Sequence, residues 1–136
     1  MRCALTIAYN GRNFFGSQIQ KETSNTILGN LEHVLKQLGI NFRVVASGRT
    51  DKGVHATGQI CHVDLPEFWD DLEKLKKVLN QMLPSSIHVK NIKAVSDDFH
   101  ARYGAKKRVY RYIIKQESSN PFFNDFVTFL EHVEFE

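Results

Sequence analysis

The residues best suited to chemistry lie in one short polar segment, residues 47–56, which reads SGRTDKGVHA. Asp51 supplies a carboxylate, Arg49 lies two positions before it, and Lys52 follows it directly. A guanidinium close to a carboxylate favours the ionised form, and an ionised carboxylate can act as a nucleophile or as a base. A glycine on either side of this cluster permits a tight loop that comes close to a ligand.

A structural interpretation of the same residues stays open. An aspartate in a glycine-containing loop is most often a turn former or a helix cap. Arg49 would then be a surface ion-pair partner that contributes little to stability. Judged by residue types alone, this structural use of Asp51 is the more common one. The case for catalysis therefore depends on the rest of the chain.

Basic side chains form a second set of candidates. The net charge of +3 does not by itself indicate a nucleic-acid partner. Residues 102–115, however, contain no acidic residue. The basic members of this run are Arg102, Lys106, Lys107, Arg108, Arg111 and Lys115. Such a run on a folded surface suits phosphates, although a solvated basic face is its more common use.

Hydrophobic periodicity predicts the elements that position these residues. Two-residue alternation or β-branched runs indicate strands, and apolar residues at helical spacing indicate helices. Thr26 is the predicted cap of the first helix, Gly39 its stop, and Pro66 the start of the second helix. The predicted strands are residues 1–9, 42–46, 59–65 and 87–95.

The resulting order, β-α-β-β-α-β, predicts an α+β fold. It is typical of a ferredoxin-like or RRM-like antiparallel sheet with two helices on one face. We expect this domain to cover residues 1–95. Residues 96–136 would begin a second, similar unit, with a strong strand over residues 108–115 that carries Tyr110.

The motifs along the chain, taken in order, resemble the TruA family of tRNA pseudouridine synthases. The active-site motif of that family matches residues 48–56 together with Gly58 and Gln59. Four further motifs match in family order: Tyr9-Asn10-Gly11 with Phe14-Phe15-Gly16 and Gln18; Asn80 with Leu83-Pro84; Phe99-His100-Ala101-Arg102 with Ala105-Lys106; and Tyr110-Arg111-Tyr112. One departure is Ser17, which stands where the family usually has tryptophan.

The resemblance implies an isomerase that converts uridine to pseudouridine on the 3′ side of the anticodon stem-loop of tRNA. It implies Asp51 as the essential carboxylate and Tyr110 as a ring stacked on the uracil. Arg49 is the candidate to occupy or brace the space that the flipped nucleotide vacates, because a guanidinium plane can stack and can bind phosphate. No cofactor or metal is implied. Residues expected to contact RNA are Lys52, His100, Arg102, Lys106, Lys107 and Arg111. The family acts as a homodimer on tRNA.

The family chain is nearly twice as long as this one, and its cleft lies between two halves. The resemblance therefore implies that these 136 residues alone are an incomplete piece that is inactive or weakly active. A different class of function also fits the strand order: a non-catalytic, RRM-like RNA-binding module. Against that alternative, the predicted strand at residues 59–65 offers no RNP-type aromatic sequence.

The two cysteines indicate the cellular compartment of the protein. Cys3 and Cys61 lie in apolar, strand-like stretches, and no secretory signal precedes them. This pattern predicts two reduced, buried thiols in a cytoplasmic protein. No apolar run approaches the length that a membrane span requires. His55 is expected to brace the loop of Asp51, since the spacing of the histidines predicts no zinc site.

Overall fold

The computed structural model describes residues 1–107, 109–110, 114–115 and 128–129. The chain divides into two compact units, Met1–Ala105 and Lys106–Glu136. The longer predicted α+β domain corresponds to the first unit, which contains both helices of the described chain.

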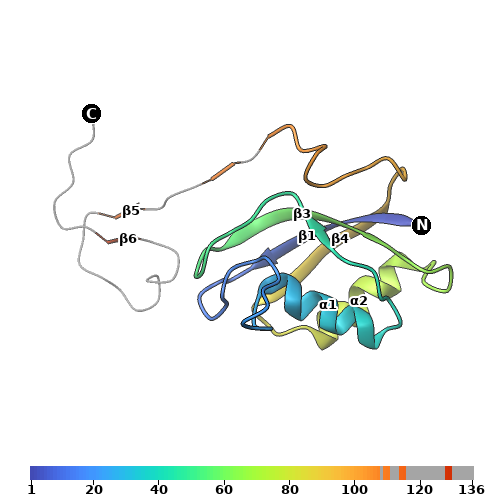
Figure 1. Cartoon of the computed structure of the whole chain (residues 1–136), viewed down its shortest axis with the longest axis horizontal. Coiled ribbons are helices and arrows are strands. Elements are labelled where there is room, and N and C mark those ends of the chain that lie inside the picture. The colour runs from blue at the N-terminus through green and yellow to red at the C-terminus, as the bar shows by residue number, and fades with distance from the viewer. Residues whose placement is uncertain (108, 111–113, 116–127, 130–136) are drawn as a thin grey trace. The chain divides into compact units, whose positions relative to one another are not determined.

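The first unit is one antiparallel sheet with two helices. Its elements are β1 (Arg2–Tyr9), α1 (Ile27–Gln37), β2 (Val45–Ala46), β3 (Ala56–Asp64), α2 (Leu72–Met82) and β4 (Ile87–Ala94). The strands are ordered β2-β3-β1-β4, and each neighbouring pair runs antiparallel. Both helices lie on the same face of the sheet (Figure 1). The predicted βαββαβ fold is thereby confirmed.

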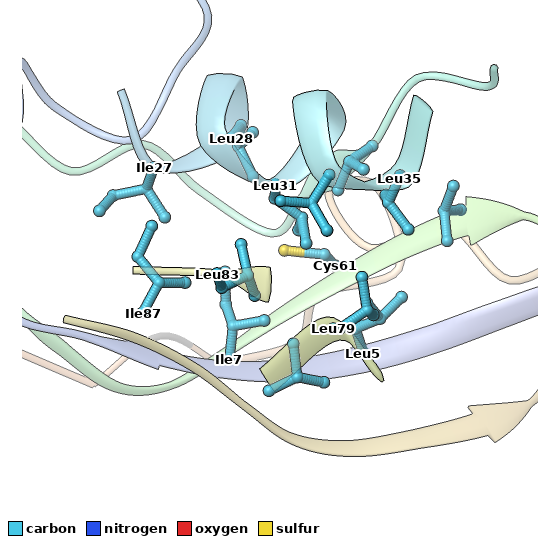
Figure 2. Packing of buried hydrophobic residues seen from close by; sticks show 14 of the residues in the cluster. Leu5, Ile7, Ile27, Leu28, Leu31, Leu35, Cys61, Leu79, Leu83 and Ile87 are labelled. Carbon is cyan, nitrogen blue, oxygen red and sulfur yellow. The ribbon is translucent and has the colours of Figure 1, made fainter. Parts of the chain in front are cut away.

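The core lies between the sheet and the helices. Alternate side chains of β1, namely Cys3, Leu5, Ile7 and Tyr9, are buried, as their two-residue spacing predicted. From α1, Leu31 and Leu35 are fully buried and point toward the sheet (Figure 2). The predicted cap of α1 is confirmed, because Thr26 Oγ1 accepts a hydrogen bond of 3.0 Å from the amide of Gly29.

The start of α2 differs from the prediction. Pro66 does not open this helix but begins a turn, in which the amide of Trp69 donates to the carbonyl of Pro66 at 3.1 Å. The helix starts at Leu72, where Asp71 Oδ1 accepts from the amide of Lys74. The physical reason is a tertiary contact that periodicity does not report: Trp69 Nε1 donates to the carbonyl of Leu38 at 2.8 Å.

The strand predicted over residues 42–46 is also shorter than expected. Only Val45–Ala46 pair with β3. The amide of Val44 donates instead to Glu32 Oε1 of α1, at 2.9 Å. Phe42, at 52% exposure, lies outside the ladder. A side chain of α1 therefore replaces the strand partner at the entrance to β2.

Both cysteines are free and fully buried in the first unit. Cys61 lies beneath α1 in the core (Figure 2). Burial raises the pKa of the Cys3 thiol, and it raises the pKa of Cys61 to about 12. The prediction of two buried thiols is confirmed.

Residues 96–105 return across the face of the sheet opposite the helices. The amide of Ala101 donates to Nδ1 of the buried His62 at 2.9 Å, and Arg2 Nη1 donates to the carbonyl of Phe99 at 2.8 Å. His62 lies on that face because its neighbours in β3, Cys61 and Val63, face the core. The compact unit thus extends through Ala105, whereas a division after position 95 stays a prediction for the longer family fold.

In the second unit, β5 (Ile114–Lys115) pairs in parallel with β6 (Thr128–Phe129). The strand predicted over residues 108–115 is wrong at Val109 and Tyr110, which are not part of a strand. Positions 108 and 111–113 lie outside the described residues. The described ladder pairs Ile114 with Thr128 and Lys115 with Phe129.

Candidate active site

The polar segment over residues 47–56 joins β2 to β3 at one end of the sheet. Its first residue is held as in a strand, since the amide of Ser47 donates to the carbonyl of Ile60 at 2.8 Å. A turn follows, in which the amide of Val54 donates to the carbonyl of Asp51 at 3.1 Å. Gly53 closes this turn with a φ of +82°, a conformation that favours glycine. The loop is therefore tight, as predicted.

Ser17 holds the residue that precedes Asp51. Its hydroxyl oxygen accepts from the amide of Thr50 at 2.8 Å, and its own amide donates to the carbonyl of Thr50 at 3.1 Å. Ser17 is fully buried. Both the amide and the carbonyl of Thr50 are therefore hydrogen-bonded to Ser17, which fixes the backbone on the N-terminal side of Asp51.

A buried polar network holds the same loop from the sheet. The hydroxyl of Tyr9 donates to Gln59 Oε1 at 3.0 Å and lies 2.8 Å from Thr50 Oγ1. Since its single proton is directed to Gln59, Thr50 is the donor in the second bond. Gln59 Nε2 in turn donates to the carbonyl of Gly48 at 2.6 Å. Strands β1 and β3 therefore bind both ends of the segment before Asp51.

Two glycines of the N-terminal segment let it approach the loop. A Cβ on Gly11 would lie 1.9 Å from the carbonyl oxygen of Val54. A Cβ on Gly16, whose φ is +83°, would lie 3.0 Å from the carbonyl oxygen of Thr50. His55 Nδ1 accepts from the amide of Gly11 at 2.9 Å, which confirms that His55 braces the loop.

The three predicted loop residues Arg49, Asp51 and Lys52 all have exposed side chains. Among the residues that the structure describes, Arg49 forms no ion pair with Asp51. Lys52 Nζ lies 4.8 Å from the centroid of the Phe15 ring, a cation–π arrangement. Asp51 thus combines a firmly held backbone with a carboxylate that is open to solvent.

The other predicted residues fall into two groups. His100 and Arg102 belong to the first unit, and His100 Nδ1 accepts from the amides of Arg102 and Tyr103 at 3.2 and 3.1 Å. The second unit contains the exposed Lys106, Lys107 and Tyr110, together with Arg111, which lies outside the described residues. Because Asp51 and Tyr110 belong to different units, their convergence on one substrate stays a prediction.

Sequence reasoning missed the residues that hold the loop. Tyr9, Gly11 and Gly16 were singled out as motif residues, but no role at the loop was assigned to them. Ser17 was noted only as a departure from the family. The available signal is the pair of glycines, Gly11 and Gly16, because glycine permits the close approach of a second backbone.

Within the described ranges, no three side chains of His, Cys, Asp or Glu gather in a way that could hold a metal ion. No helix in the same part of the chain is long and apolar enough to cross a membrane.

Comparison with known proteins identifies relatives of this chain. The model of a family described as tRNA pseudouridine synthase matches residues 5–104, which lie within the first unit. A protein of Geobacillus sp. (strain WCH70), named tRNA pseudouridine synthase A, is 44% identical over 121 residues, which are 84% of this chain and 46% of that protein.

Two further relatives carry the same name. One from Limosilactobacillus reuteri (strain DSM 20016) is 38% identical over 135 residues, covering 96% of this chain and 52% of the relative. One from Geobacillus kaustophilus (strain HTA426) is 46% identical over 113 residues, covering 82% and 43%. The chain thus spans about half the length of the curated relatives it matches. Since the family match covers most of the chain and includes the loop of Asp51, the chain belongs to the tRNA pseudouridine synthase family.

Proposed function

We propose that the protein to which this chain belongs isomerises uridine to pseudouridine in tRNA, with Asp51 as the essential carboxylate. The observation that carries this proposal is the exposed Asp51 side chain on a backbone held by Ser17, Tyr9 and His55. The names of the relatives support tRNA as the substrate. The 3′ side of the anticodon stem-loop is the proposed region of modification.

The central group of the proposed reaction is one correctly placed carboxylate. The N-glycosidic bond from N1 breaks, the uracil turns, and C5 forms a bond to the same sugar carbon, with the C5 proton lost and a proton gained by N1. All atoms come from the substrate and no net oxidation occurs, so the proposed reaction uses no cofactor. An ionised carboxylate can act as the nucleophile or as the base in such a sequence.

The target nucleotide must leave its stack before Asp51 can reach the sugar or the base. Flipping costs a few kcal/mol, so side chains that hold the extruded nucleotide are needed. Arg49 is suited to this role, because its exposed guanidinium extends from the same loop and can stack or bind phosphate. Tyr110, 62% exposed, supplies a ring for the uracil, a contact worth about 1–3 kcal/mol.

The remaining basic side chains are proposed to position the tRNA backbone rather than to read bases. They are Lys52, His100, Arg102, Lys106, Lys107 and Arg111. We further propose that the protein acts as a homodimer in the cytoplasm.

Replacing Asp51 by asparagine tests the catalytic role. The assay needs both halves of the family fold, which can be obtained by joining this chain to the C-terminal half of a relative. Asp51→Asn is expected to lower pseudouridine formation by about 10²–10⁴-fold or more, because the carboxylate charge is lost while the loop is retained. Chromatography of digested nucleosides provides the measurement, since the product has the same mass as uridine.

Asp70→Asn is the matched control, because Asp70 is also exposed but lies before α2, outside the loop. It should leave the rate unchanged. Isomerisation by Asp51→Asn at the parent rate would exclude the proposed role. Salt-dependent tRNA binding without any isomerisation by the parent would favour the non-catalytic RNA-binding alternative.

A further inference from the structure

A second candidate site lies at the other end of β2. A cavity of about 230 Å³ opens there between the N-terminal loop, α1, the entrance to β2 and the segment that follows β4. Its lining includes Arg43, Glu32, His100, Arg102 and Tyr103, all of them in the first unit. The cavity therefore combines cationic and aromatic side chains, which is the combination that binds single-stranded nucleic acid.

The aromatic wall is built as a column of rings. Tyr103 stacks on His100 with centroids 4.3 Å apart and an interplanar angle of 20°. His100 contacts the edge of the buried His62, with centroids 4.7 Å apart. The two hydrogen bonds that His100 Nδ1 accepts from backbone amides fix the orientation of that ring. Tyr103 is thus braced from one side and still 82% exposed, so a further ring can stack on it.

The charge at the cavity suits an anion. Arg43 and Arg102 line it together with one carboxylate, Glu32. One oxygen of the Glu32 carboxylate is already hydrogen-bonded, because Oε1 accepts from the amide of Val44. A guanidinium binds phosphate through a planar set of donors, so Arg43 and Arg102 favour a phosphate at the mouth of this cavity.

We propose that this cavity binds one unpaired nucleotide of the RNA substrate, with its base on Tyr103 and its phosphate on Arg43 and Arg102. The inference rests on the proposed function and adds a site apart from the loop of Asp51. Ala46 lines the cavity and lies five residues before Asp51. Five residues span at most about 18 Å, so the nucleotide would come from the same region of RNA as the target uridine.

The test is a fluorescence anisotropy titration of the 136-residue chain with a labelled single-stranded oligouridylate. Tyr103→Ala is expected to weaken binding about 5- to 100-fold, because the stacking surface is lost. Arg43→Gln is expected to lower the slope of log affinity against log salt by about 0.7, as for one lost phosphate contact. Lys77→Gln, an exposed position on α2, is the control and should bind like the parent.

Competition separates a nucleotide site from a plain anion site. Uridine monophosphate should displace the oligonucleotide at lower concentration than inorganic phosphate, because only the nucleotide has a base that can stack. Equal potency of the two competitors would overturn the inference. Parent-like binding by both Tyr103→Ala and Arg43→Gln would also overturn it, as would the absence of binding by the parent. Circular dichroism of each variant verifies that the fold is retained.

The outcome is separable from that of the proposed function. Nucleotide binding in the cavity is read from the Tyr103 and Arg43 variants, whereas isomerisation is read from Asp51→Asn, which lies outside the cavity. If that variant kept full isomerisation, the catalytic proposal would fail while the nucleotide site could still stand. If the Tyr103 and Arg43 variants bound normally, the site would fail while catalysis by Asp51 was untouched.

Discussion

At the scale of single residues, the proposed catalytic role of Asp51 depends on the residues that hold its backbone. Ser17 and Thr50 exchange two hydrogen bonds, and both glycines of the N-terminal segment lie against the loop. Removing a buried donor or acceptor generally costs about 1–3 kcal/mol, because the partner is left unpaired. The loop is therefore sensitive to substitutions at residues that do not contact the side chain of Asp51.

Glycine substitutions test this dependence. In Gly11→Ala the new methyl group would meet the backbone of Val54, which no rotamer change can relieve, so we expect a loss of about 1–3 kcal/mol or more in unfolding free energy. Gly53→Ala meets no atom within 4 Å and suffers only the strain of φ +82°, about 1–2 kcal/mol. Urea unfolding of the 136-residue chain measures both.

The control for both is Gly58→Ala, where the added methyl group would make an ordinary 3.7 Å contact with Thr6 and φ is not positive. It should be neutral or slightly stabilising. A Gly11→Ala protein as stable as Gly58→Ala would show that the N-terminal segment does not pack on the loop as described.

At the scale of elements, side chains from helices complete the two edge strands of the sheet. Glu32 of α1 binds the amide of Val44 at the entrance to β2. Asn80 of α2 binds β4 twice: its Nδ2 donates to the carbonyl of Val89 at 2.9 Å, and its Oδ1 accepts from the same residue's amide at 2.8 Å. An amide side chain thus imitates a strand partner at an edge that would otherwise be open.

Asn80→Ala is expected to destabilise the first unit by about 1–3 kcal/mol, because it leaves the backbone donor and acceptor of the buried Val89 without their side-chain partner. Thermal and urea unfolding measure the change. Asn80→Asp should not restore stability at neutral pH, since a carboxylate can accept from the amide but cannot donate to the carbonyl.

Lys77→Ala, on the exposed side of the same helix, is the matched control and should shift stability by less than about 0.5 kcal/mol. Equal effects of Asn80→Ala and Lys77→Ala would mean that the double hydrogen bond contributes nothing to the attachment of α2.

At the scale of the whole molecule, the chain spans about half the length of its curated relatives. Its first unit presents Asp51 on an exposed loop, whereas the proposed chemistry needs a flipped base enclosed on more than one side. Tyr110, the proposed partner of that base, belongs to the other unit.

We therefore expect the 136-residue chain alone to form no detectable pseudouridine, while the same chain joined to the C-terminal half of a relative is active. Nucleoside chromatography after incubation with tRNA measures both. Substantial turnover by the short chain, shown to be monomeric by light scattering, would contradict the view that a second half completes the site.

Local sequence pattern was enough to predict the sheet, the two helices and the tight loop of Asp51. Alternation along β1 showed which side chains face the core, because neighbouring residues of a strand point to opposite sides. Thr26 marked the start of α1, because a capping side chain bonds to a backbone only a few residues away. These features depend on neighbours in sequence, so they can be read without the fold.

Contacts between distant residues were decided by the tertiary structure alone. The bond from Thr50 to Ser17 joins residues 33 apart, and that from Tyr9 to Thr50 joins residues 41 apart. The late start of α2 and the cavity beside Tyr103 likewise depend on which segments meet in space. Periodicity reports which face of an element is apolar, but it carries no information about the partner that a polar group will find.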